Sequence, residues 1–97
     1  MDREATLDRL KATAADLKAR YAVRSLSVFG SIARGDDHPT SDVDVLVTFE
    51  GRATFDNFMG LKLDLEELFG RRVDLLTPKA LTSAMQTVID RDAIFIS

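Results

Sequence analysis

The sequence contains no cysteine and a single histidine, His38, which we interpret as an exposed loop residue without a role. Without thiols there is no disulfide framework, no Cys-based zinc site and no thiol catalysis, and one imidazole cannot build a histidine-rich metal centre. The N-terminus lacks the apolar run of a signal peptide, and no stretch approaches the roughly 18 apolar residues of a membrane span. We therefore expect a cytoplasmic protein that does not bind membranes.

Turn-forming residues are also scarce, with 5 glycines and 2 prolines among 97 residues. The remainder is 45% hydrophobic and 30% charged, which is ordinary for a globular chain. This length predicts one domain spanning residues 1–97. The net charge of −3 argues against a basic nucleic-acid-binding face.

Hydrophobic periodicity divides the chain into alternating helices and strands. Strict polar–apolar alternation makes residues 42–49 the clearest strand, and three- and four-residue apolar steps make residues 3–20 an amphipathic helix. The predicted strands are 25–29, 42–49, 72–76 and 93–96, and the predicted helices are 3–20, 54–69 and 80–91, with a helical turn at 32–34. This alternation predicts a sheet covered by helices, in the α/β or α+β class.

The helix predicted over residues 54–69 carries apolar residues around more of its circumference than a one-sided surface helix does. Deep burial is one explanation. The other is a second apolar edge, around Met59 and Leu63, that contacts a partner. The sequence leaves both open.

Gly30-Ser31 stands where a strand ends and a helical turn begins. A glycine there allows close backbone approach to a ligand, and amides at a helix start favour phosphate, although a plain turn has the same residues. Gly30 and Gly35 have the spacing of a P-loop, but Asp36 and Asp37 follow where that loop needs Lys and Ser or Thr. A P-loop is therefore excluded.

Asp42 and Asp44 are separated by one residue on the predicted strand, so both carboxylates lie on one face within reach of a shared divalent cation. The alternative is a polar, solvated strand end. Asp74 lies mid-strand between Val73 and Leu75, a position that predicts a buried carboxylate with a partner. If the two strands are neighbours, the three carboxylates together could hold two Mg²⁺ ions. The alternative for Asp74 is a salt bridge to a neighbouring arginine, Arg71 or Arg72.

The combined pattern resembles the signature of the polymerase-β-like nucleotidyltransferase superfamily. Its two halves are Gly30-Ser31 and, ten residues later, Asp42-x-Asp44, and the resemblance covers roughly residues 24–77. The length matches the minimal nucleotidyltransferase (MNT) group. The resemblance implies the nucleotidyltransferase fold, a small mixed β-sheet flanked by helices, with ATP as substrate and Mg²⁺ in a two-metal site.

The resemblance also implies roles for individual residues. Gly30 and Ser31 would hold the β- and γ-phosphates, and Asp42 and Asp44 would be metal ligands. Asp74 would bind the second metal and help deprotonate the attacking hydroxyl. The last position is Arg34, where a cation would steady the triphosphate, although an exposed charge without a role explains it nearly as well.

Minimal members of this group are typically paired with a HEPN protein, often a ribonuclease toxin. The resemblance therefore implies an antitoxin that transfers AMP to a tyrosine of that toxin. Two alternatives remain: a non-catalytic antitoxin that masks the toxin by binding, and a small-molecule nucleotidyltransferase of the antibiotic-modifying kind.

Overall fold

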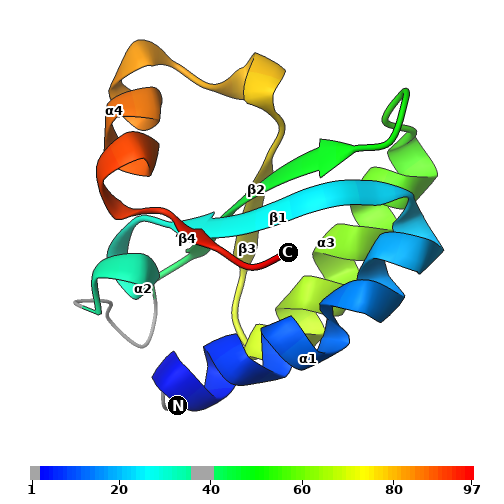
Figure 1. Cartoon of the computed structure of the whole chain (residues 1–97), viewed down its shortest axis with the longest axis horizontal. Coiled ribbons are helices and arrows are strands. Elements are labelled where there is room, and N and C mark those ends of the chain that lie inside the picture. The colour runs from blue at the N-terminus through cyan, green and yellow to red at the C-terminus, as the bar shows by residue number, and fades with distance from the viewer. Residues whose placement is uncertain (1–2, 36–40) are drawn as a thin grey trace.

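The computed structural model of the chain describes residues 3–35 and 41–97 (Figure 1). His38 and most of the predicted loop around it lie outside the described residues. The helices are α1 (Arg3–Tyr21), α2 (Ser31–Arg34), α3 (Phe55–Phe69), the 3₁₀ turn η1 (Pro78–Ala80) and α4 (Ser83–Asp92). The strands are β1 (Val23–Phe29), β2 (Val43–Phe49), β3 (Val73–Leu76) and β4 (Ile94–Phe95).

The four strands form one mixed sheet in the order β3-β2-β1-β4. β2 pairs with β3 in parallel, whereas β1 pairs antiparallel with both β2 and β4. This confirms the predicted element order and the small mixed sheet. It also makes β3 and β4 the two edges, so residues on β3 have a neighbouring strand on one side alone.

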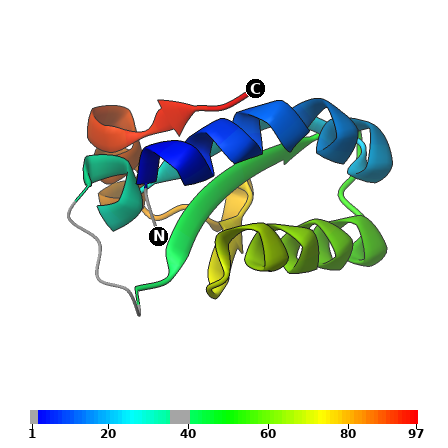
Figure 2. The same ribbon diagram turned by 90° about the horizontal axis from the view of Figure 1, so that it is seen from below.

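One face of the sheet is covered by α1 and α3, which pack against each other (Figures 1 and 2). The strict alternation of β2 directs its valines toward these helices, while Asp44, Leu46 and Thr48 stay half-buried on the opposite face. Fully buried side chains at the centre of the core include Leu10, Leu26, Val45, Leu61, Leu65 and Phe69. Because α4 covers the opposite face at one end only, part of that face is open to solvent.

Two predicted boundaries differ from the observed ones by more than one residue. β1 begins at Val23 rather than residue 25, because Ala22 adopts a left-handed conformation (φ 55°) that turns the chain directly from α1 into the sheet. The helix predicted from residue 80 begins at Ser83, where the Thr82 side chain accepts a hydrogen bond from the Met85 amide. Pro78 starts a separate 3₁₀ turn before it.

The apolar residues of α3 are not all buried. Leu61, Leu65 and Phe69 face the core, but Phe55 is 77% exposed and Leu63 is 57% exposed. Deep burial is therefore wrong as the explanation for the whole apolar surface of this helix. None of the helices in the described ranges is long and apolar enough to cross a membrane.

Candidate functional site

The pairing of the strands gathers the predicted site residues at one end of the sheet. Asp44 of β2 stands opposite Phe29 of β1 on one side and Asp74 of β3 on the other. Gly30 follows Phe29 directly, so the glycine and these two carboxylates converge although they come from three strands. The condition that the strands at residues 42–49 and 72–76 are neighbours is thus met, in parallel register.

The expectation that Asp74 is buried is wrong, because its side chain is exposed. Its strand is an edge strand, and α1 and α3 cover only the opposite face, where Val73 and Leu75 are buried. An acid on the open face of an edge strand keeps its hydration and needs no buried partner. The prediction failed because apolar residues on either side of Asp74 indicate that their own face of the strand is buried. They say nothing about the opposite face, on which Asp74 lies.

Two features of its position require glycine at residue 30: the backbone conformation and the lack of room for a Cβ atom. Its φ of 76° and ψ of −151° lie in a region that is almost exclusive to glycine. A Cβ built on Gly30 would also collide with the Asp44 carboxylate oxygen Oδ2. The main chain and this carboxylate are therefore closer than any side-chain-bearing residue would allow.

Ser31 begins the short helix α2, which ends at Gly35 in a left-handed conformation (φ 81°). The Gly35 amide donates to the Ser31 carbonyl oxygen at 3.0 Å, which closes the turn. Ser31 is half-buried and follows Gly30 directly in the chain. This geometry is compatible with the predicted phosphate contact.

Arg34 forms an ion pair that the sequence did not indicate. Its Nη1 lies 3.4 Å from Oδ2 of Asp92, a side chain 11% exposed at the end of α4. The hydrogen bond from Arg91 is the main cause that lowers the pKa of the Asp92 carboxyl; burial opposes it, and the hydrogen bond from Arg34 lowers the pKa further. The pair ties α2 to α4, and no local pattern around Asp92 could have revealed it. The charge of Arg34 also acts on Asp44, where it opposes the increase in pKa.

A cavity of about 270 Å³ opens beside Gly30 and Asp44. Its far wall is apolar and comes from α4, about 40 residues further along the chain. The lining residues are Phe29, Gly30, Asp44, Ala84, Met85 and Val88. The apolar wall of α4 can contact an apolar part of a substrate, while Asp44 can bind an anionic part only through a bridging cation.

Residues 10–95 match the model of the nucleotidyltransferase domain family. The chain belongs to this family. The protein is thus a nucleotidyltransferase, as the spacing of Gly30-Ser31 and Asp42-x-Asp44 predicts.

Two similar proteins support this assignment. Protein adenylyltransferase MntA of Thermococcus cleftensis is 38% identical over 81 residues, which cover 84% of this chain and 82% of that protein. A solved structure of a minimal nucleotidyltransferase superposes with a TM-score of 0.79 at 39% identity, covering 97% of this chain and 95% of the other.

The fold recurs in a toxin–antitoxin complex from Shewanella oneidensis. The complex contains a tri-AMPylated HEPN toxin and an MNT antitoxin, and the superposed chain has a TM-score of 0.65 at 13% identity. The match covers 94% of this nucleotidyltransferase and 71% of the other chain. At that identity the likeness shows a shared fold.

A raised pKa distinguishes Asp44 from an ordinary surface carboxylate in this nucleotidyltransferase. Burial raises the pKa of Asp44 to about 6, and the nearby charges of Asp74 and Asp42 add to the increase. Asp42 and Asp74 are themselves exposed. Excess negative charge of this kind is stabilised by a bound cation.

The described residues contain no group of three carboxylate or imidazole side chains close enough to hold a metal ion unaided. The acids nevertheless suit a hard divalent cation, since carboxylate oxygens are its preferred ligands and the negative charges of Asp74 and Asp42 act on Asp44. Such a cation would take its remaining oxygen ligands from phosphate groups or water.

The raised pKa of Asp44 predicts that Asp44→Asn stabilises the metal-free protein at pH 7.5. An aspartate that titrates at about 6 when folded and near 3.8 when unfolded binds its proton more tightly in the folded state. The contribution of Asp44 to the free energy of unfolding is therefore most favourable below pH 4 and is lost as pH rises through 6. Urea unfolding in EDTA should show a higher unfolding free energy for Asp44→Asn at pH 7.5 and no difference at pH 4.

The matched control is Asp8→Asn, which removes an exposed carboxylate from α1 and should change stability little at either pH. Equal stability of Asp44→Asn and the parent protein at pH 7.5 would contradict the raised pKa of Asp44.

Proposed function

We propose that this nucleotidyltransferase transfers AMP from ATP to a tyrosine hydroxyl of a partner HEPN ribonuclease toxin, and so acts as its antitoxin. The carrying observation is the contact of the Gly30 backbone with the Asp44 carboxylate, at the end of the sheet where Asp74 is the neighbour of Asp44. Similarity to the MntA adenylyltransferase supports the choice of AMP and of a protein acceptor. The MNT–HEPN complex with the same fold supports the kind of partner.

In this proposal the backbone of Gly30 and the amide and hydroxyl of Ser31 bind the β- and γ-phosphates of ATP. The carboxylates of Asp42 and Asp44 would hold Mg²⁺, and Asp74 would hold a second ion. Bound Mg²⁺ supplies neutralisation of phosphate charge and polarisation of the α-phosphorus. Arg34, anchored through Asp92, adds positive charge near the triphosphate.

The protein's own residues then position the two reactants. An acceptor hydroxyl attacks the α-phosphorus in line, the bond to the bridging oxygen breaks, and pyrophosphate leaves. Asp74 accepts the hydroxyl proton, a role that suits its exposed place on an edge strand, where a protein-borne hydroxyl arrives from solvent. The apolar wall of α4, with Met85 and Val88, suits a flat ring such as that of tyrosine.

We further propose that residues 1–97 act as one minimal catalytic domain and that α3 contributes to toxin binding. Phe55 and Leu63 are exposed apolar side chains on that helix. Burial of such side chains by a partner protein stabilises the complex. The partner would supply the acceptor and part of the surface around it.

The proposal predicts metal-dependent label transfer. Incubation with α-³²P-ATP and Mg²⁺ should label the protein encoded beside this one, and EDTA should abolish the label, since the acids alone would repel the triphosphate. Mass spectrometry of the labelled toxin should locate AMP on a tyrosine. A tight complex with the toxin but no label would contradict AMP transfer and favour an antitoxin that masks the toxin by binding. Label on a small-molecule acceptor alone would favour an antibiotic-modifying enzyme.

A further inference from the structure

The strand β3 is shorter than its neighbour, which leaves part of the sheet edge uncovered. Pairing between β2 and β3 ends at Leu46 and Leu76, whereas β2 continues to Phe49. Pro78, which has no amide hydrogen, then turns the chain away into η1. Within the described ranges no strand pairs with this side of residues 47–49.

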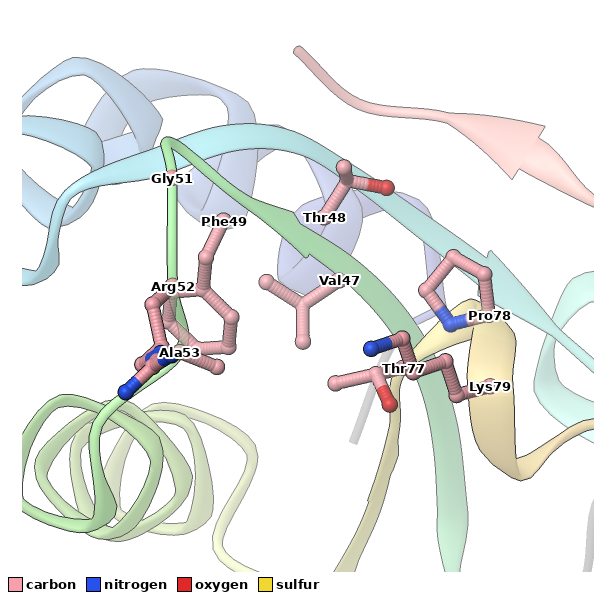
Figure 3. A pocket seen from close by; sticks show the side chains of 9 residues that line it. All are labelled: Val47, Thr48, Phe49, Gly51, Arg52, Ala53, Thr77, Pro78 and Lys79. Carbon is pink, nitrogen blue, oxygen red and sulfur yellow. The ribbon is translucent and has the colours of Figure 1, made fainter.

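A cavity of about 400 Å³ occupies the place where a longer β3 would run (Figure 3). The loop after β2 closes it on one side and the chain after β3 closes it on the other, as Figure 3 shows. Its lining combines residues 47–49 of β2 with Gly51, Arg52, Ala53, Thr77, Pro78 and Lys79. The cavity is therefore bounded by a free strand edge as well as by side chains.

Two cations, Arg52 and Lys79, flank this cavity from opposite sides (Figure 3). Both are exposed, and among the described residues neither has a carboxylate within 4.0 Å. Elsewhere arginines are often paired, as Arg24 is with Glu50 and Arg20 with Asp64. Although the chain has a net charge of −3, these two unpaired cations make the cavity favourable for a negatively charged ligand.

The cavity is separate from the carboxylate site. Residues 47–49 follow Asp44 by three to five positions, which corresponds to about 10–16 Å along a strand. The two sites share β2 but no lining residue, since the other cavity is lined from Phe29, Asp44 and α4. A ligand here would leave the proposed transfer site open.

We propose that this edge of β2 binds an extended acidic segment of another protein, which adds a short strand beside residues 47–49. The segment's main chain would pair with the free edge, and its acidic side chains would contact Arg52 and Lys79. Alternate side chains of an extended segment point to opposite faces, so apolar residues between the acids would enter the cavity.

The test uses two blocked pentapeptides and the ¹⁵N-labelled full chain. Glu-Val-Glu-Val-Glu should shift the backbone amide signals of Val47, Phe49 and Gly51, and Lys-Val-Lys-Val-Lys should bind at least about tenfold more weakly. Arg52→Gln/Lys79→Gln should lose about the same factor for the acidic peptide. The control Arg9→Gln/Lys11→Gln removes equal charge from exposed positions on α1 and should bind normally.

A charge-reversed variant, Arg52→Glu/Lys79→Glu, should prefer the basic peptide, a gain that unfolding cannot produce. Binding of both peptides equally by the parent protein would overturn the proposal, as would no shift at these amides. Identical shifts from acetate at the same carboxylate concentration would also overturn it, because the site would then be a simple anion pocket. Since peptide binding is read without ATP, its failure is distinguishable from failure of AMP transfer.

Discussion

Asp42→Asn/Asp44→Asn should lower AMP transfer by at least about a thousandfold while the chain remains folded. The substitution keeps side-chain size but removes the two charges proposed to hold the cation, and metal-ion charge stabilisation is worth several kcal/mol at about 1.4 kcal/mol per tenfold in rate. The measurement is the initial rate of label transfer from α-³²P-ATP to the partner. The pKa of Asp44, raised to about 6, predicts that removing its charge does not destabilise the fold.

The control is Asp8→Asn/Asp16→Asn, which removes two exposed carboxylates from α1 and should leave the rate within about twofold. Undiminished transfer by Asp42→Asn/Asp44→Asn would contradict the proposed site. Growth protection against the toxin should be lost together with transfer. Protection that survives without transfer would show that neutralisation occurs by binding.

Gly30→Ala should destabilise the fold by about 3 kcal/mol, more than Gly51→Ala, because it adds a steric clash to backbone strain. Both glycines have positive φ, 76° and 69°. A methyl group at Gly30 would also collide with the Asp44 carboxylate, whereas nothing lies within 4 Å of one at Gly51. Gly51→Ala should therefore cost only the left-handed backbone, about 1–2 kcal/mol. Urea unfolding of the two variants at pH 7.5 measures the difference.

A double-mutant cycle separates the collision from the backbone cost. In an Asp44→Ala background the carboxylate is gone, so Gly30→Ala should cost less than in the parent protein. An unchanged cost would mean that backbone conformation alone explains the requirement for glycine. Equal destabilisation by Gly30→Ala and Gly51→Ala would contradict the close contact.

The local patterns of the sequence were sufficient to predict the helices and strands and to select Gly30, Ser31, Asp42 and Asp44 as site residues. Alternation over residues 42–49 predicted β2 and the side on which Asp42 and Asp44 lie, because a strand's two faces follow directly from its period of two. The ten-residue interval between Gly30-Ser31 and Asp42 predicted the family, which the match over residues 10–95 confirms.

Position relative to the edges of the sheet could not be predicted in the same way. Asp74 looked buried because its sequence neighbours are apolar, and it is exposed because β3 is an edge strand with one open face. The pairing of Arg34 with Asp92 joins residues 58 positions apart, which no periodicity records. The free edge at residues 47–49 exists because β3 ends at Leu76 beside a longer β2.

By itself, then, the sequence determined which residues alternate, where the chain turns and which acids share a face, since these depend on neighbours a few residues apart. The tertiary structure alone decided which strands are edges, how deeply each acid is buried and which charges meet. Those properties depend on strand order and helix coverage. They arise from packing between segments that are distant along the chain. That packing buries Asp44 enough to raise its pKa and leaves Asp74 exposed.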